Sequence, residues 1–238
     1  MAKVIGIMGE SGSGKTTSLR NLDPETTFYI DCDKKGLSWK GWRNQYNKAA
    51  GNFMQTDDKD VVLELLAKIN CDNSMLAAVQ KRRGKTPKLM TDEDKQKVAR
   101  FKTVVIDTLN GVMVADEVER MREKGYDKWV DLAQCVWLIL DYVNTMRDDL
   151  TIIIMCHSQT QKEDDGYTFT RIKTSGKKLD KLNVESKLTT VLYATAIGGE
   201  YRFQTHANNS TAKTPLGAFD EDTIPNDITL VIKALEEY

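Results

Sequence analysis

The sequence has little of the residues that build metal sites or covalent cross-links. It has four cysteines and two histidines in 238 residues, and no two cysteines form a C-x-x-C motif. This scarcity argues against a structural zinc site and against a disulfide framework. We therefore expect reduced thiols, as in a cytoplasmic protein.

The sequence also lacks an excess of charge of either sign and any long apolar run. Its 34 basic and 35 acidic residues give a formal charge of −1, so nucleic acid could be attracted only by a local basic cluster. No segment approaches the roughly 18 apolar residues of a membrane-spanning helix, and the first apolar run continues directly into a motif, so we expect no leader. We expect a soluble protein without membrane contact.

What the sequence does have is an alternation of short apolar runs and amphipathic segments. The apolar runs predict buried strands at 4–8, 27–32, 103–106, 151–155 and 189–196. Helical patterns follow Lys15 and cover 59–69, 109–124 and 128–147. This alternation predicts an α/β fold with a mostly parallel sheet flanked by helices.

Two polar regions interrupt the alternation. Residues 71–100 contain KRRGK at 81–85 and TDEDKQK at 91–97, and we interpret them as an insertion with a short helix capped by Thr91. Residues 160–181 contain YTFTRIK, which alternates as an exposed strand would, and predict a protruding hairpin or loop. The length suits a single domain over 1–238, which we expect to end in a β-rich segment.

The strongest motif is GESGSGKT at residues 9–16, which matches the phosphate-binding loop G-x-x-x-x-G-K-[ST] between an apolar run and a helix-forming segment. Lys15 should reach the β- and γ-phosphates, Thr16 should place its hydroxyl on Mg²⁺, and Thr17 should lie near the α-phosphate. The alternative is a plain glycine-rich turn. The predicted nucleotide-binding residues are Gly9, Glu10, Ser11, Gly12, Ser13, Gly14, Lys15, Thr16 and Thr17.

Acidic residues follow two of the apolar runs. Asp107 ends TVVID and is the predicted second metal ligand beside Thr16, unless it merely caps the next helix. Thr108 stands where many ATPases carry a glutamate, so the group that orients the attacking water must come from elsewhere. FYIDCD supplies Asp31 and Asp33, and Asp33, farther beyond the strand, is the better candidate, with an ordinary turn acid as the alternative.

Polar residues also follow the fourth apolar run, TIIIMCHSQ. His157, Ser158 and Gln159 stand where the apolar run stops and could sense a γ-phosphate by hydrogen bonding. We predict Gln159 as the sensor. The alternatives are an ordinary polar residue at the strand end and a structural histidine at position 157.

The order of the phosphate-binding loop, FYIDCD, VVIDT and CHSQ resembles the core of RecA-type ATPases. In those proteins a strand ending like F-I-D-A-E carries the catalytic glutamate and a later strand ends in a glutamine sensor, and Asp33 and Gln159 fall on these positions. Aspartate is one methylene shorter, which leaves slow hydrolysis or a different base open. The resemblance implies a RecA-like P-loop core with the sensor strand between the P-loop and Walker B strands.

The resemblance is closer to phage nucleotide-binding proteins that act as RecA-like single-strand annealing or recombination ATPases. The segments GYDKWVDLA at 125–133 and NNSTAKTPLGAFDEDTIPND at 208–227 are similar to that group. It implies a homo-oligomer, as a ring or filament, in which ATP lies at a subunit boundary. A neighbouring subunit would then supply a cation, for which the candidates are Arg171, Lys173 and Lys213.

Basic and aromatic residues interleave after the sensor strand, which would let charge and base stacking act together on single-stranded DNA. The predicted DNA-binding residues are Tyr167, Phe169, Arg171, Lys173, Lys177, Lys178 and Lys181. A second basic cluster comprises Lys81, Arg82, Arg83 and Lys85. For each cluster the alternative is a solvated charged face.

These features predict Mg²⁺-dependent ATP binding and hydrolysis coupled to single-stranded DNA in recombination, annealing or repair, with a single-strand DNA-binding protein as a candidate partner. One alternative is a nucleotide or small-molecule kinase, in which Asp31 or Asp33 binds the acceptor and 160–181 acts as a lid. Another is a non-hydrolysing ATP-dependent switch or scaffold. No N/TKxD guanine signature is apparent, which favours ATP over GTP.

Overall fold

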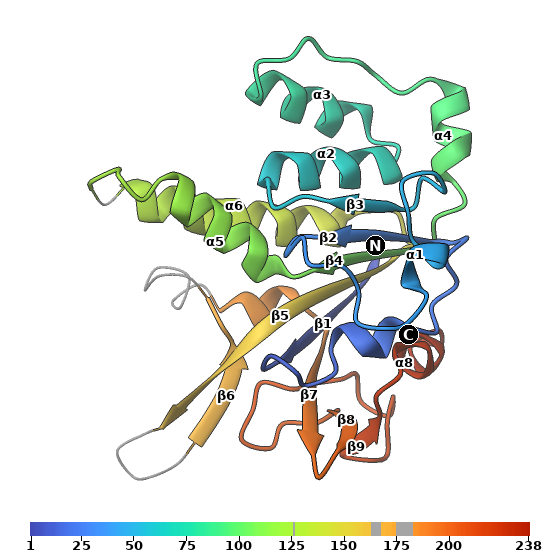
Figure 1. The fold of residues 1–238 in the computed structure, drawn as a ribbon, viewed down its shortest axis with the longest axis vertical. Coiled ribbons are helices and arrows are strands. Elements are labelled where there is room, and N and C mark those ends of the chain that lie inside the picture. Colours follow the sequence, from blue (N-terminus) through green and yellow to red (C-terminus); the bar gives the residue numbers. More distant parts are fainter. Residues whose placement is uncertain (126, 163–167, 175–182) are drawn as a thin grey trace.

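The computed structural model describes residues 1–125, 127–162, 168–174 and 183–238. Within these ranges the strands form one sheet in the order β3-β2-β4-β5-β1-β7-β8-β9, with β6 paired to β5 (Figure 1). The strands from β3 to β7 along this order run parallel, and β6, β8 and β9 are antiparallel. The bounds are β1 Lys3–Gly9, β2 Thr27–Asp31, β3 Phe53–Gln55, β4 Thr103–Asp107, β5 Thr151–Lys162, β6 Thr168–Ile172, β7 Thr190–Ile197, β8 Glu200–Gln204 and β9 Thr223–Pro225.

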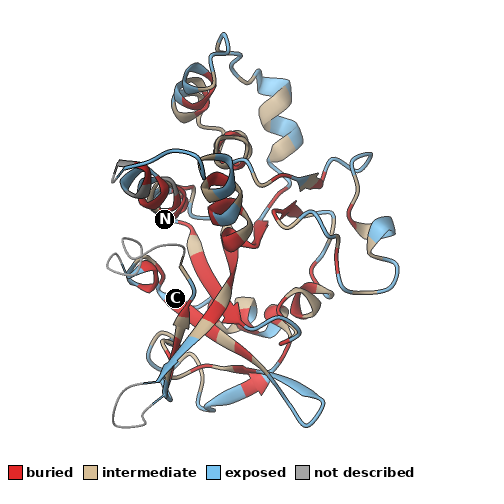
Figure 2. Ribbon diagram, turned by 60° about the vertical axis from the view of Figure 1, so that its left-hand side comes forward, coloured by how far each residue is buried: buried red, intermediate tan, exposed pale blue. Residues whose placement is uncertain are grey.

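The central strands are apolar on both faces because each face of the sheet is covered. In β1, Val4 and Met8 face one core cluster, whereas Ile5 and Ile7 face the other. All five predicted apolar runs are strands, and the central part of the sheet is buried along its length (Figure 2). The fold is therefore the predicted α/β arrangement. The strand order also places β5 between β1 and β4, as the RecA resemblance implies.

Three long helices build the core on the first face: α2 Lys59–Ile69, α5 Leu109–Glu119 and α6 Asp127–Thr145. The helices α3 Asn73–Arg82 and α4 Asp92–Val98 come from the predicted insertion and lie outside α2 (Figure 1). Thr91 caps α4 in a reciprocal capping box with Asp94, as its sequence suggested. None of the helices in the described part of the chain combines the length and apolar character needed to span a bilayer.

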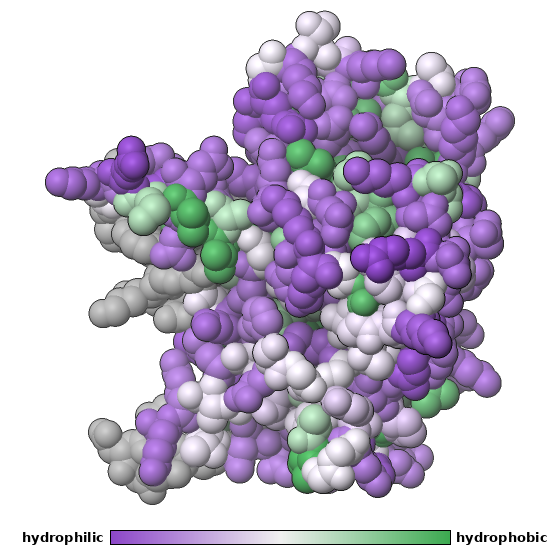
Figure 3. All heavy atoms as spheres, viewed as in Figure 1, coloured by the Kyte–Doolittle hydropathy of each residue, from purple (hydrophilic) through white to green (hydrophobic). Residues whose placement is uncertain are grey.

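The helix α5 exposes apolar side chains on the side that faces away from the sheet. Val114 and Val118 are each more than half exposed, and Met121 follows just after the helix end. Their spacing of four and three residues places them in one stripe. The stripe coincides with an apolar patch over the projecting α5–α6 pair (Figure 3).

The second face is covered by shorter elements: η1 Thr16–Leu19, α1 Trp42–Gln45 and α8 Ile228–Ala234. The predicted helix after Lys15 is therefore only a four-residue 3₁₀ helix. Pro24 disfavours a helical conformation at Asp23, and β2 begins at Thr27. The chain has room for one turn before it enters the sheet.

The C-terminal segment is β-rich, as predicted, and it ends in a helix. Gly198 and Gly199, both with positive φ, form the two-residue turn between β7 and β8. Side chains of β9 and α8 then enter the second core. These side chains are Ile224, Ile228, Val231 and Leu235.

The strands β5 and β6 pair antiparallel from Ser158↔Ile172 to Lys162↔Thr168, and this ribbon projects beyond the rest of the sheet (Figure 1). The backbone N–H of Lys173 donates to the carbonyl of His157 at 2.7 Å. This bond closes the base of the ribbon at His157 of β5, the strand that lies beside the phosphate-binding loop.

Candidate nucleotide-binding site

The phosphate-binding loop leaves the carboxyl end of β1, where Gly9 pairs with His157 of β5. Gly12 and Gly14 have φ of +82° and +87°, in the left-handed region that favours glycine. A Cβ atom on Gly9 would collide with the Ser13 hydroxyl and would lie 2.8 Å from the carbonyl oxygen of Ala194. The loop conformation therefore requires glycine at these positions.

Lys15 lies at the bottom of the loop and is only 7% exposed. Its Nζ donates to the carbonyl oxygens of Gly9 and Glu10, both at 2.7 Å. Burial lowers the pKa of Lys15, and the nearby Asp107 opposes that shift. The ammonium group is held by weak, neutral carbonyl acceptors. A phosphate oxygen of a bound nucleotide would be a charged acceptor in their place.

Thr16 and Asp107 meet below the loop, with the Thr16 hydroxyl donating to Asp107 Oδ2 at 2.9 Å. Tyr29 also donates to Oδ2, at 2.6 Å, whereas Oδ1 is buried and has no hydrogen-bond partner among the described residues. Burial raises the pKa of Asp107, opposed by these two hydrogen bonds. Asp107 does not cap α5, because the side chain of Thr108 does. A hydroxyl and a half-bonded carboxylate suit Mg²⁺, which prefers oxygen ligands.

These residues open into a pocket of about 310 Å³. It brings the loop together with β4, β5, β8 and the segment after β2. The lining residues are Ser11, Gly12, Gly14, Lys15, Thr16, Thr17, Lys35, Ser38, Asp107, His157 and Tyr201. The hydroxyls of Thr17 and Ser38 lie 2.9 Å apart across it. Six of the nine predicted nucleotide-binding residues and both predicted metal ligands thus line one pocket, whereas Gly9, Glu10 and Ser13 are not part of its lining.

Comparison with protein families agrees with this geometry. A family model described as an AAA domain matches residues 1–216. The chain belongs to this AAA-domain family. Membership indicates nucleoside triphosphate binding and hydrolysis as its class of activity. A comparison with curated proteins gave no match.

In this AAA domain Asp33 lies beside the pocket without lining it. Its Oδ1 accepts a hydrogen bond from the Thr108 hydroxyl at 3.0 Å, and its Oδ2 pairs with Lys35 at 2.6 Å. A Cβ on Gly111 would lie 2.8 Å from Asp33 Oδ1, so glycine in the first turn of α5 allows this approach. The acid thus reaches the site together with Thr108, the residue in the position where many ATPases carry glutamate.

Asp31 is not available to a substrate. It is buried, and its Oδ2 accepts from the backbone N–H of Gly36 at 2.8 Å and from Gln55 Nε2 at 2.9 Å. These bonds fix the turn that follows β2.

On the sensor strand, the structure brings His157 into the pocket and leaves Gln159 outside its lining. The strand does not end at these residues as predicted, because β5 continues to Lys162 by pairing with β6. Gln159 therefore lies within the projecting ribbon, opposite Arg171, and its Nε2 is a buried donor without a partner in the described ranges. Burial, reinforced by Lys15, lowers the pKa of His157, so the ring is neutral near pH 7.

The candidate cations for a neighbouring site lie outside the pocket. Lys213 is exposed, and its backbone pairs with Val191. Arg171 and Lys173 belong to β6 and the residues after it, together with the predicted DNA-binding residue Phe169. The other predicted DNA-binding residues, Tyr167, Lys177, Lys178 and Lys181, lie outside the described residues.

The second basic cluster is largely neutralised by acids near α2. Arg82 pairs with Asp60, Arg83 with Glu64 at 2.9 Å, and Lys85 with Glu64 at 3.7 Å. This arrangement favours the alternative interpretation, a charged surface bonded within the fold.

Sequence reasoning missed four residues around the site. Lys35 and Ser38 were hidden in the polar segment after β2, although Lys35 follows Asp33 by two positions and so carried a local signal. Tyr29 is a buried strand residue whose hydroxyl alone reaches the site. Tyr201 comes from β8, and no local pattern links that strand to the loop.

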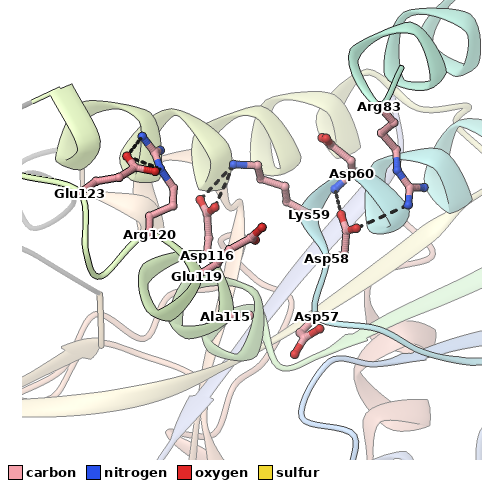
Figure 4. Close-up of a pocket in the computed structure, with 10 residues that line it drawn as sticks. All are labelled: Asp57, Asp58, Lys59, Asp60, Arg83, Ala115, Asp116, Glu119, Arg120 and Glu123. Carbon is pink, nitrogen blue, oxygen red and sulfur yellow. Dashed lines mark hydrogen bonds and ion pairs between the residues drawn. The ribbon is translucent and has the colours of Figure 1, made fainter. Parts of the chain in front are cut away.

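A larger pocket of about 680 Å³ lies between α2 and α5 and is lined by six carboxylates and three cations (Figure 4). Each of its three cations is paired with one of its acidic residues: Lys59 bonds Asp116 at 3.0 Å, Arg120 bonds Glu123 at 2.7 Å, and Arg83 bonds Asp58 at 3.5 Å. We assign the nucleotide to the smaller pocket, where the glycine-rich loop, Lys15 and the unpartnered carboxylate oxygen meet.

Proposed function

We propose that the chain is an Mg²⁺-dependent ATPase. The observation that carries this proposal is the 2.9 Å hydrogen bond between Thr16 and Asp107 directly below Lys15, with Asp107 Oδ1 left without a partner among the described residues. These two residues would hold Mg²⁺, which when bound supplies positive charge against the phosphate oxygens. Lys15 would exchange its bonds to the loop carbonyls for bonds to the β- and γ-phosphates.

The water-orienting group is Asp33, held by Thr108. An attacking water beside the pair would donate to the Asp33 carboxylate, which can accept its proton. Lys35 bonds the same carboxylate and lines the pocket. Burial alone would lower the pKa of Lys35, but Asp33 and Asp107 outweigh burial and raise it. The chain therefore places a charged cation at the phosphate end of its own site.

His157 contacts the γ-phosphate in this proposal, in place of Gln159. The supporting bonds run through Asn110 of α5, whose Oδ1 accepts from the His157 backbone N–H at 2.7 Å. Asn110 Nδ2 donates to the carbonyl of Lys173 at 2.8 Å. A movement of His157 would thus be transmitted through the Asn110 side chain to Lys173, just after the end of β6.

We further propose that single-stranded DNA is the effector, in a RecA-like protein of phage recombination, annealing or repair. The support is the projecting β5–β6 ribbon with Phe169, Arg171 and Lys173, an aromatic and cationic combination suited to a single strand. A homo-oligomer in which a neighbour contributes Arg171, Lys173 or Lys213 remains part of the proposal. The apolar stripe of α5 supports it, because such exposed patches commonly mark protein contacts.

The test is phosphate release from MgATP with and without single-stranded DNA, for the unaltered chain and for Lys15→Ala. We expect turnover that DNA stimulates and that the substitution abolishes. Adding nucleosides as acceptors tests the kinase alternative, which would give a phosphorylated acceptor; the bonds that hold Asp31 argue against that residue as the acceptor-binding acid and leave Asp33. ATP binding without turnover would support a non-hydrolysing switch and contradict the ATPase proposal.

A further inference from the structure

The C-terminal segment forms one wall of the P-loop pocket through Tyr201. Its ring packs on Gly14: a Cβ on that glycine would lie 2.6 Å from Tyr201 Cδ1 and 3.1 Å from Cγ. Tyr201 shares a strand face with Phe203, which is fully buried in the second core, yet Tyr201 itself is 48% exposed. An aromatic ring is thus held at the rim of the pocket.

Asn226 also approaches Gly14. It is only 6% exposed, and its Oδ1 lies 3.3 Å from the same Cβ position on Gly14. Neither Oδ1 nor Nδ2 has a hydrogen-bond partner in the part of the chain that the structure describes. A buried carboxamide with both ends unbonded is costly, and such groups are otherwise nearly always paired.

The position of Asn226 is fixed by residues that follow the P-loop. Arg20 Nη1 donates to the carbonyl oxygen of Asn226 and to that of Thr17, both at 3.0 Å. Asn21 Nδ2 also donates to the carboxylate of Asp227, the residue after Asn226, at 2.6 Å. The residues directly after the P-loop therefore hold the unbonded carboxamide against Gly14.

The direction of the nucleotide identifies what these side chains would meet. In the proposed function Asp107, Lys35 and His157 lie at the phosphate end of the pocket, and the sequence motif predicts Thr17 near the α-phosphate. We take the nucleoside to leave the pocket past Thr17, and the large aromatic ring among the residues that line the pocket is that of Tyr201. Aromatic side chains stack on nucleobases, and an asparagine amide matches the amino group and neighbouring ring nitrogen of adenine.

We propose that Tyr201 and Asn226 form the nucleobase subsite, in which Tyr201 stacks on the base and the Asn226 carboxamide hydrogen-bonds its edge, favouring adenine. This inference rests on the proposed function. Because the carboxamide is shielded from solvent, the half-exposed ring shifts off Gly14 to admit the base. Tyr201 lies within residues 1–216 that match the AAA-domain family, whereas Asn226 lies beyond them, so the edge-reading half of the subsite comes from the segment after the match.

Tyr201 is tested by calorimetric binding of MgATP and of magnesium tripolyphosphate, which has no base. We expect Tyr201→Ala to weaken MgATP binding by about 5- to 150-fold and to leave tripolyphosphate binding unchanged. Tyr201→Phe keeps the stacking face and should bind MgATP like the unaltered chain. The control is Tyr238→Ala, which removes an exposed tyrosine near the C-terminus. Unchanged MgATP affinity in Tyr201→Ala, or an equal loss for tripolyphosphate, would overturn the stacking role.

Asn226 is tested with Asn226→Asp, which keeps the shape but replaces the donor with an acceptor. We expect weaker MgATP binding and a shift of the ATP-to-GTP preference toward GTP, whose base presents two adjacent N–H donors. Asn208→Asp, at an exposed position, is the matched control. An unchanged ATP-to-GTP ratio in a folded Asn226→Asp chain would overturn the edge-reading role.

The outcomes also separate this inference from the proposed function. If the unaltered chain bound neither MgATP nor tripolyphosphate, the proposed function would fall and the subsite with it. If it bound both equally and Tyr201→Ala had no effect, the ATPase proposal would stand and the subsite alone would fall.

Discussion

The P-loop pocket and the charged pocket between α2 and α5 differ in how their polar groups are bonded. The charged pocket is about twice as large, at about 680 Å³ against 310 Å³, and each of its three cations forms an ion pair with one of its acidic residues. In the smaller pocket, Asp107 Oδ1 has no partner among the described residues and Lys15 rests on neutral carbonyls. Buried groups that lack their natural partners, more than volume, mark the place where a charged ligand fits.

The comparison is tested most strongly by removing one lysine from each pocket. Lys15→Ala should lower ATP turnover by at least about 10²-fold, because it removes the cation that faces the phosphates. Lys59→Ala, in the charged pocket, should leave turnover unchanged. Phosphate release measured on both variants decides this, and comparable losses would contradict the assignment of the nucleotide to the smaller pocket.

Acidic residues near the two pockets should differ in the same way as the lysines. Asp33→Asn should reduce turnover by about 10²-fold or more while ATP still binds, because general bases contribute that much to proton transfer. Asp57→Asn, in the charged pocket, is the matched control. Single-turnover kinetics and ATP binding measured together check this prediction, and intact turnover in Asp33→Asn would show that another group orients the water.

A subtler comparison concerns the two sensor candidates on β5. His157→Ala should slow hydrolysis by about 10-fold, the worth of one hydrogen bond to a charged group. Gln159→Ala should change hydrolysis little without DNA, because its side chain is outside the pocket lining. Steady-state phosphate release distinguishes them; the reverse order would restore Gln159 as the sensor.

The charged pocket should matter to folding instead. Asp58 caps α2 by accepting from the backbone N–H groups of Asp60 and Val61. Asp58→Ala should lower the free energy of unfolding by about 1 kcal/mol, and Asp58→Asn should retain most of the cap. Urea unfolding measures this, with ATP turnover as a second readout that should not change. A fall in turnover in the folded variant would give this pocket a functional role.

The smallest expected effect is the pH dependence that His157 adds to stability. Its pKa is lowered in the folded chain, so the unfolded chain binds more protons at mildly acidic pH. Stability should therefore fall as pH drops below about 6.5, the ordinary histidine value. His157→Gln should flatten this part of the curve, with His206→Gln as the control. Denaturant unfolding at pH 5 to 8 measures it, and an unchanged slope in His157→Gln would contradict it.

Much of the fold could be predicted because parallel strands buried on both faces have nearly continuous apolar sequences. The strand at 103–106 could therefore be predicted from its apolar run, and the helix at 59–69 from its helical periodicity. The short helix η1 was not, because its length depends on how soon the chain must return to β2. The extension of β5 to Lys162 depends on pairing with β6, which the apolar pattern did not contain.

The site could be predicted where its residues are adjacent in sequence or end a buried strand. Lys15, Thr16 and Asp107 meet as their motifs suggested. The prediction of Gln159 as the sensor did not anticipate that His157 lines the pocket, because both residues lie on one side of a strand and only the three-dimensional path shows which enters the pocket. Tyr201 and Asn226 reach the loop through the β7–β8 hairpin and an anchor, the bonds of Arg20 and Asn21 to Asn226 and Asp227, which no local sequence pattern indicates.

That anchor bears on where the foldable unit ends. The family match stops at residue 216, but Ile224, Ile228, Val231 and Leu235 fill the second core, and Arg20 bonds Asn226. Each of these apolar side chains contributes about 1.5–3 kcal/mol when buried. A fragment cut at the family boundary would lack these side chains, would expose the part of the second core that they cover, and would be expected to aggregate. Boundaries drawn from sequence similarity alone would therefore divide this protein through its own core.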